Sequence, residues 1–273
     1  MSAKRILNSD DSPVDPTQQD SWGDWRQYTQ ARIALGRSGE SLPSAEVLKF
    51  GLAHAQARDA IHTPLDTERL TTELKQEGWD TRIVRSQAID RTQYLVRPDL
   101  GRRLAADSAL VQTSLTGYDV GFVVGDGLSS LAVQRQVVPF LQALKPMLTP
   151  HLALAPIVVA TQARVALADE VGEQLGLRLV VMLIGERPGL SSPDSLGVYL
   201  TYAPKVGKHD AERNCISNVR PEGLDYPAAA FKLNWLVEQA LSRQLTGVNL
   251  KDESDLMLVS DIARKEPHSL IQS

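Results

Sequence analysis

A few polar side chains lie at positions where the sequence predicts a binding or catalytic site. Glu186 and Arg187 follow six consecutive apolar residues, 179–184. Such an uninterrupted run is typical of a strand buried on both faces of a parallel sheet, and open α/β sheets bind ligands at the carboxyl ends of their strands. Glu186 is therefore either a carboxylate that accepts hydrogen bonds from the amides of a large ligand or half of a surface ion pair with Arg187.

Three arginines, Arg97, Arg102 and Arg103, lie close together around Asp99. Guanidinium groups suit the binding of a carboxylate or a phosphate because each offers a planar fork of donors. The alternative interpretation is a solvated turn that opens a helix. Spacing alone leaves both interpretations open.

A partial nucleotide-binding pattern follows another apolar run. Gly125, Gly127 and Ser130 lie between a predicted strand and a predicted helix, but a dinucleotide fingerprint has a glycine where Ser130 stands. The backbone of this turn could hold an anionic or amide-bearing group. The alternative is a tight turn that needs small residues for packing.

The other reactive residue types form no recognisable constellation. The five histidines are scattered, and the HExxH, G-x-S-x-G and Walker A patterns are absent. Cys215 is the only cysteine, and by default it is a buried, inert thiol. Val165, at the start of a predicted helix, is by default a packing residue. We therefore expect neither catalytic residues nor a metal site of this chain's own.

The composition predicts an ordinary soluble protein. The chain has 273 residues, of which 42% are hydrophobic, and its net charge of -4 provides no basic field for nucleic acid. The amino end lacks the apolar core of a signal peptide, and no apolar run is long enough to span a membrane. A single cysteine fits a reducing cytoplasm.

The elements that position these residues indicate an α/β fold. Four parts are predicted: a flexible arm (1–20), a helical N-terminal subdomain (21–115), a Rossmann-like domain (116–250) and a C-terminal tail (251–273). In the third part, predicted helices alternate with predicted strands at 119–124, 155–160, 179–184 and 197–202. This alternation indicates a mostly parallel sheet flanked by helices.

Four motifs in this order resemble one known family. RPDLGRRL (97–104), VVGDGLSS (123–130), LIGERPGL (183–190) and RNCISNVRPEGL (213–224) are similar to the small subunit of ethanolamine ammonia-lyase. The resemblance covers about residues 22–250. It implies an adenosylcobalamin-dependent lyase that, with a larger TIM-barrel subunit, converts ethanolamine to acetaldehyde and ammonia by a radical mechanism.

The resemblance also implies a cofactor site. In this family cobalamin lies between the two subunits, and the large subunit provides most of the ethanolamine site. The matching cobalamin-binding positions are Val165, Glu186 and Cys215, which we expect at one edge of the sheet, from a helix start and two strand ends. Val165 would pack against the corrin ring, and Glu186 and the Cys215 region would bind its amide side chains. None of the three is expected to be catalytic.

Two absences refine these expectations. Many cobalamin proteins supply a histidine to cobalt from a D-x-H-x-x-G motif, which this sequence lacks, so we expect base-on cobalamin with no protein histidine ligand. The polar amino end does not resemble the amphipathic helix that targets family members to a bacterial microcompartment. We therefore expect a cytoplasmic protein, with encapsulation left open.

Two other classes of function remain as alternatives. One is a noncatalytic cobalamin-binding or assembly module that stabilises a large subunit. The other is a Rossmann oxidoreductase that uses NAD, although its fingerprint is incomplete.

Overall fold

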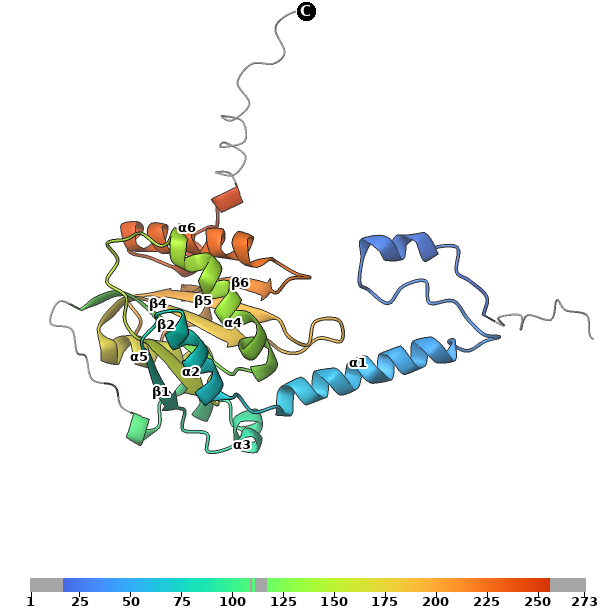
Figure 1. Cartoon of the computed structure of the whole chain (residues 1–273), viewed down its shortest axis with the longest axis horizontal. Helices are drawn as coiled ribbons and strands as arrows, with labels where there is room; N and C mark the ends of the chain where they lie inside the picture. The colour runs from blue at the N-terminus through green and yellow to red at the C-terminus, as the bar shows by residue number, and fades with distance from the viewer. Residues whose placement is uncertain (1–16, 109, 111–116, 256–273) are drawn as a thin grey trace, which may run out of the picture. The chain divides into compact units, whose positions relative to one another are not determined.

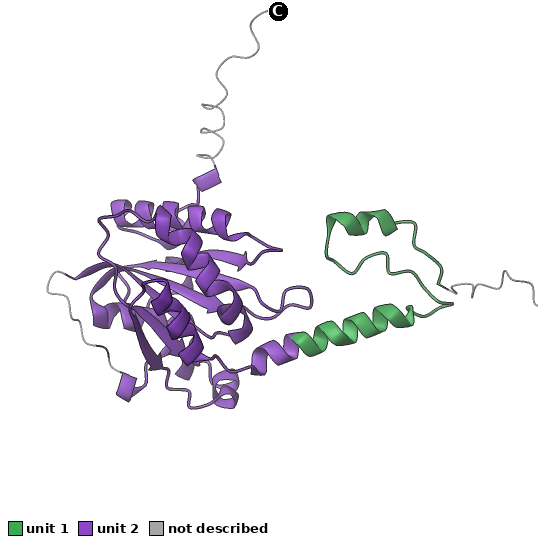
Figure 2. Ribbon diagram, viewed as in Figure 1, with its two compact units in different colours: residues 1–56 green, residues 57–273 purple. Residues whose placement is uncertain are grey.

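A computed structural model of the chain describes residues 17–108, 110 and 117–255. Two compact units can be separated, residues 1–56 and 57–273, and the division falls inside helix α1 (Ser44–His62) (Figure 2). The arm predicted at 1–20 and the tail predicted at 251–273 lie mostly outside the described residues. The four sequence-based boundaries stay predictions.

The first unit exposes apolar side chains. Trp22, Trp25 and Tyr28, in and beside the 3₁₀ segment η1 (Gly23–Tyr28), are each more than half exposed, and the centroids of successive rings lie 6.2 and 6.1 Å apart. Several apolar side chains of α1 are also exposed, among them Val47, Leu48 and Leu52. Exposed apolar groups of this density are typical of surfaces that contact other proteins.

The second unit is built around a six-stranded mixed sheet with strand order β1-β3-β2-β4-β5-β6 (Figure 1). The strands are β1 (Thr81–Arg85), β2 (Tyr118–Gly125), β3 (Ile157–Thr161), β4 (Leu177–Gly185), β5 (Leu196–Tyr202) and β6 (Asn214–Val219). β1, β3, β2 and β4 are parallel, whereas β5 is antiparallel to both β4 and β6. The predicted α/β class is confirmed, and the parallel part of the sheet ends at β4.

The helices begin and end largely where sequence signals place them. They are α2 (Thr67–Gln76), α3 (Arg91–Val96), α4 (Ser130–Leu144), α5 (Leu167–Leu175) and α6 (Tyr226–Arg243). The side chain of Ser129 caps α4 by accepting a hydrogen bond from the Ala132 backbone, and Gly176, with φ of 65°, ends α5. The later 3₁₀ segments are η2 (Leu100–Arg102), η3 (Ala106–Ser108), η4 (Lys145–Met147), η5 (Asp210–Glu212) and η6 (Gly247–Asn249).

The two faces of the sheet are covered unequally. Helices α2, α4 and α6 contribute to the core on one face, which includes inward residues of β5 and β6 such as Val198 and Ile216. On the other face, α5 packs against β2, β3 and β4, and Tyr199 is the residue of β5 or β6 that reaches this second core. On this second face Cys215 and Ser217 of β6 are exposed, whereas Gly197 and Thr201 of β5 are buried and Tyr199 is half-buried.

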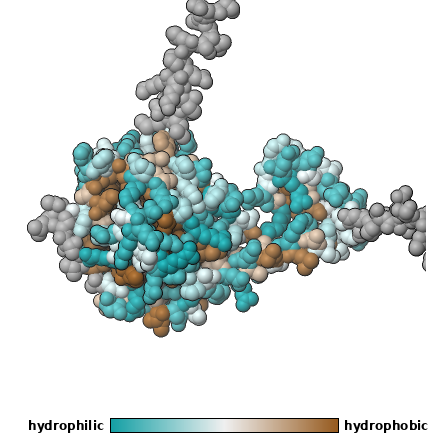
Figure 3. Space-filling view, in the orientation of Figure 1, coloured by the Kyte–Doolittle hydropathy of each residue, from teal (hydrophilic) through white to brown (hydrophobic). Residues whose placement is uncertain are grey.

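The visible surface of the second unit is mostly hydrophilic, with separate hydrophobic patches (Figure 3). Among the described helices, none combines the length and the apolar character needed to cross a bilayer.

Candidate functional site

The second face of β5 and β6 carries polar side chains around the half-buried Tyr199. Tyr199 pairs in register with Cys215, whose Sγ lies 3.3 Å from Ser217 Oγ. Cys215 and Ser217 are exposed, whereas the residue between them, Ile216, faces the core. Burial, reinforced by the neighbouring Cys215 and Glu186, raises the pKa of the Tyr199 phenol above its usual value.

A β-bulge brings Glu186 to this face. Between the register pairs Leu196↔Val219 and Val198↔Ile216, β6 has two residues opposite one residue of β5. Asn218, with φ of 58°, lies in the bulge, and its backbone N–H donates to Glu186 Oε2 at 3.2 Å. The carboxylate at the end of β4 is thus held against the edge strand.

Gly197 leaves room for this carboxylate. A Cβ atom at Gly197 would lie 3.1 Å from Glu186 Cγ and Oε1, and 3.2 Å from the ring of Tyr199. Glu186, Gly197 and Tyr199 are therefore packed against one another. Side chains from β4, β5 and β6 form one continuous surface on this face.

A cleft of about 330 Å³ lies beside Tyr199. Its lining also includes Val165 and Ala166 before α5, Pro98 and Arg102 near η2, and residues 208–210 of the β5–β6 loop. A larger cleft of about 790 Å³ lies at the amino ends of β1, β2 and β3, and contains none of the predicted site residues. Of the three predicted cofactor residues, Val165 lines the smaller cleft, whereas Glu186 and Cys215 lie outside its lining.

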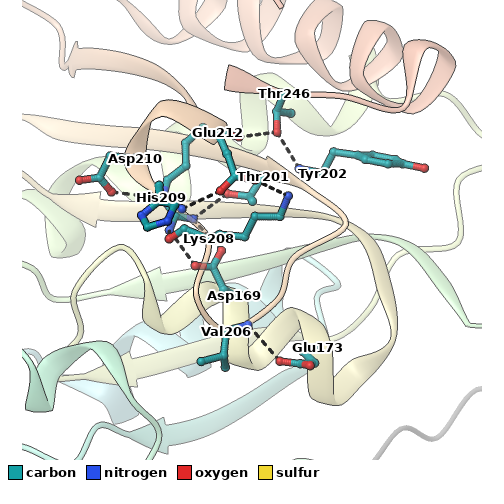
Figure 4. A network of polar contacts seen from close by, with 11 residues as sticks. Asp169, Glu173, Thr201, Tyr202, Val206, Lys208, His209, Asp210, Glu212 and Thr246 are labelled. Carbon is teal, nitrogen blue, oxygen red and sulfur yellow. Dashed lines mark hydrogen bonds and ion pairs between the residues drawn. The ribbon is translucent and has the colours of Figure 1, made fainter. Parts of the chain in front are cut away.

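A buried ion pair fixes the β5–β6 loop to α5 (Figure 4). Arg213 donates from Nη1 and Nη2 to the two carboxylate oxygens of Asp169, at 2.6 and 2.7 Å, and both side chains are almost fully buried. Arg213 also donates to Thr201 Oγ1 and to the carbonyl of Lys208. The β5–β6 loop, which forms one wall of the cleft, is therefore attached to α5.

The arginine cluster separates into different roles. Arg97 forms an exposed ion pair with Asp99, and Arg103 pairs with Glu170 at 2.9 Å. Arg102 lines the cleft. The solvated-turn interpretation describes Arg97, whereas Arg102 is placed to meet a ligand.

The partial nucleotide fingerprint is a packed turn. A Cβ atom at Gly127, whose φ is 58°, would lie 2.1 Å from the carbonyl oxygen of Gly185. Asp126, which is buried, accepts hydrogen bonds from the backbones of Gln162 and Ala163, each at 2.8 Å. This turn therefore holds β4 and the loop after β3, which favours the packing interpretation.

The three predicted cofactor residues lie on the same side of the sheet, with two differences from expectation. Val165 lies two residues before α5 and lines the cleft. Cys215 was expected at the carboxyl end of a strand, but it is the second residue of an antiparallel-paired edge strand. Its thiol is exposed rather than buried, because none of the described helices packs over this face of β6.

Sequence reasoning missed Tyr199. The pattern at 197–202 predicts one more strand of a parallel sheet, in which both faces are buried. The alternation of Val198 and Leu200 with Gly197 and Tyr199 is the available signal that the two faces of this strand have different surroundings.

Within the described ranges, no three His, Cys, Asp or Glu side chains gather as the ligands of a metal ion would.

The family model and the similar proteins that match this chain all point to the same family. Residues 19–251 match the family model described as ethanolamine ammonia-lyase light chain (EutC). The chain is 55% identical over 247 residues to the ethanolamine ammonia-lyase small subunit of Pseudomonas putida (strain W619), covering 88% of this chain and 91% of that protein. It is 52% identical over 257 residues to the same subunit of Pseudomonas fluorescens (strain Pf0-1), covering 92% and 93%. The small subunit of Azotobacter vinelandii (strain DJ / ATCC BAA-1303) is 54% identical over 250 residues, covering 88% and 92%.

Proposed function

Because this chain belongs to the ethanolamine ammonia-lyase light-chain family, we propose that it is the small subunit of an enzyme that converts ethanolamine to acetaldehyde and ammonia. The proposed partner is a large subunit, which binds most of the ethanolamine. The proposed cofactor is adenosylcobalamin, which supplies the radical chemistry when it is bound between the two subunits. The task of this chain is then to bind and orient the cofactor.

The observation that carries the proposal is the polar second face of β5 and β6 beside the cleft, where Cys215 and Ser217 are exposed. Cobalamin is a broad, nearly flat ring with apolar methyl groups and many amide side chains, so it needs an extended surface of mixed polarity. The described surface supplies a carboxylate at Glu186, a hydroxyl at Ser217 and an apolar contact at Val165. These groups fit the ligand without any bond from a protein atom to cobalt.

The proposed roles follow from the geometry of each residue. Glu186 can accept hydrogen bonds from ligand amides through the oxygen lone pairs that Asn218 does not use. Cys215 and Ser217 present a thiol and a hydroxyl on the same face. Val165 packs at the rim of the cleft, where an apolar side chain excludes water from the ring edge.

We also propose that cobalamin binds base-on. His209 is the histidine in the lining of the cleft, so it is the residue to test as a cobalt ligand. Electron paramagnetic resonance of the Co(II) state, with isotopically labelled protein histidine, should give no superhyperfine coupling to the label. Such coupling, lost in His209→Ala, would overturn this part of the proposal.

Reconstitution tests the function as a whole. Acetaldehyde release from ethanolamine should require this chain, its cognate large subunit and adenosylcobalamin together. Activity of the large subunit and cofactor without this chain would instead support the alternative of a noncatalytic assembly module. A folded mixture of both subunits that binds no cobalamin would overturn the proposal.

A further inference from the structure

The cleft beside Val165 has an excess of basic side chains. Arg102, Arg164 and Lys208 line it together with His209, and Asp210 is the one carboxylate in its lining. Lys208 already pairs with Glu212 at 2.8 Å, and Asp210 lies 3.4 Å from Arg213. The charge offered to a ligand therefore comes mainly from the two arginines.

Both arginines have unused hydrogen-bonding capacity. The guanidinium of Arg102 makes no hydrogen bond or ion pair with any residue that the structure describes. The guanidinium of Arg164 lies over the ring of Tyr94, 4.2 Å from its centroid, and its Nη2 donates to the Tyr94 carbonyl at 3.2 Å. Arg164 Nε is buried and has no acceptor. A buried donor without a partner is costly, so this atom indicates an acceptor that the chain itself does not provide.

The backbone holds these two arginines in fixed positions. The N–H of Arg164 donates to the carbonyl of Gly101 at 2.7 Å, which joins the loop after β3 to η2. Gln162, in the same loop, has φ of 53°, and its Oε1 is also buried without a partner. Positive φ at a residue other than glycine is a form of strain that clusters at functional sites.

We infer that the cleft lined by Arg102 and Arg164 binds the phosphodiester of the cofactor's nucleotide arm. This inference rests on the proposed function. If this chain is the floor for base-on cobalamin and the large subunit holds the substrate on the opposite side, the arm that carries the lower base must lie on this chain's side. The phosphodiester is the negatively charged group of that arm, and guanidinium groups bind phosphate through paired donors.

Selective loss of affinity tests the inference. Cobinamide, which keeps the corrin ring but lacks the nucleotide and its phosphate, serves as the comparison ligand. In the complex of both subunits, Arg102→Gln should weaken cobalamin binding about ten-fold, which corresponds to the loss of one charge-assisted hydrogen bond, and should leave cobinamide binding unchanged. Equilibrium dialysis with detection by absorbance measures both affinities without relying on turnover.

A neighbouring arginine provides the matched control. Arg97→Gln removes the same charge from the same segment, but Arg97 pairs with Asp99 and does not line the cleft, so both affinities should stay at the wild-type value. Arg102→Lys keeps the charge and should lose less affinity for cobalamin than Arg102→Gln. Raising the salt concentration should weaken cobalamin binding in the wild type more than in Arg102→Gln.

Each outcome bears on a definite claim. Equal losses for cobalamin and cobinamide in Arg102→Gln, or no loss for either, would overturn the phosphate site while the proposed function stands. A wild-type complex that binds neither ligand would overturn the proposed function itself. The Arg102 side chain is exposed and forms no hydrogen bond or ion pair among the described residues, so Arg102→Gln should fold normally, and circular dichroism checks this.

Discussion

Arg213 and Asp169 meet in the interior through two parallel hydrogen bonds, with 2% and 1% of their side chains exposed. The arginine precedes β6, and the aspartate lies in the first turn of α5. The pair therefore connects the β5–β6 loop, which forms one wall of the cleft, to the helix that covers the parallel strands.

Removing one partner of this pair should destabilise the protein strongly. Arg213→Met leaves the Asp169 carboxylate buried without its counter-charge, and we expect a loss of about 3–5 kcal/mol in the free energy of unfolding. Arg69→Met is the control, because it breaks the exposed Arg69–Glu73 pair and should cost less than about 1 kcal/mol. Urea unfolding of the full-length chain measures both, and equal costs would contradict the structural role of the buried pair.

Gly127 and Gly51 should respond in opposite ways to the same substitution. Gly127→Ala places a Cβ against the Gly185 carbonyl at a position with positive φ, so we expect a loss of several kcal/mol or failure to fold. Gly51 lies inside α1, where an added Cβ would meet no other atom within 4 Å, so Gly51→Ala should be neutral or stabilising by up to about 1 kcal/mol. Thermal unfolding compares them, and a tolerated Gly127→Ala would reopen the nucleotide-binding interpretation of this turn.

Asp119 should make stability depend on pH. Its carboxylate accepts hydrogen bonds from the Ala153 backbone at 3.0 Å and from Arg178 at 2.7 Å, and these contacts lower its pKa below the usual value. Because the folded-state pKa is below that of the unfolded chain, the stabilisation is complete above about pH 4 and is lost as pH falls through the folded-state pKa.

Asp119→Asn tests this linkage. We expect it to cost about 1 kcal/mol at pH 7, and we expect the difference from wild type to shrink as the pH is lowered below about 4. Denaturant unfolding at several pH values measures the difference. A cost that stays constant down to about pH 2.5 would show that the ionised carboxylate is not the stabilising group.

The sequence predicted buried strands better than edge strands. The apolar run at 179–184 predicted β4 because both of its faces are covered. β1 (TRIVR) was missed because it is a short edge strand with two arginines and one fully buried residue, Val84. β6 was missed because its open face carries Cys215 and Ser217, so its apolar content is low. Both strands form because of the strands with which they pair, and a local sequence pattern contains no information about pairing partners.

The candidate site was predictable in part for the same reason. Glu186 could be singled out because it follows a strong strand signal. The approach of Asn218 to Glu186 depends on a bulge in β6, and the position of Tyr199 beside Cys215 depends on the antiparallel pairing of β5 with β6. Long-range pairing therefore determined the parts of the site that local patterns did not reveal.

Glu186 should control the affinity for cobalamin and not the identity of the product. Glu186→Gln keeps one acceptor oxygen but removes the charge that strengthens hydrogen bonds from ligand amides, so we expect binding about ten-fold weaker in the two-subunit complex, with acetaldehyde still formed. Glu222→Gln is the control, since Glu222 forms a partly exposed pair with Arg220 beyond β6. An unchanged dissociation constant in Glu186→Gln would remove Glu186 from the proposed site.

Cys215 offers a direct probe of what covers the exposed face of β6. It is the only cysteine of the chain and its thiol is exposed, so a maleimide should label this subunit at one position. Mass spectrometry of this subunit measures its labelling in the two-subunit complex. Saturating cobalamin should slow this labelling at least several-fold, because the bound ring would cover the thiol. Cys215→Ser should abolish labelling and retain most of the cobalamin affinity, since a hydroxyl replaces the weak thiol donor. Labelling that is equally fast with and without bound cobalamin would place the cofactor elsewhere than on the face formed by β5 and β6.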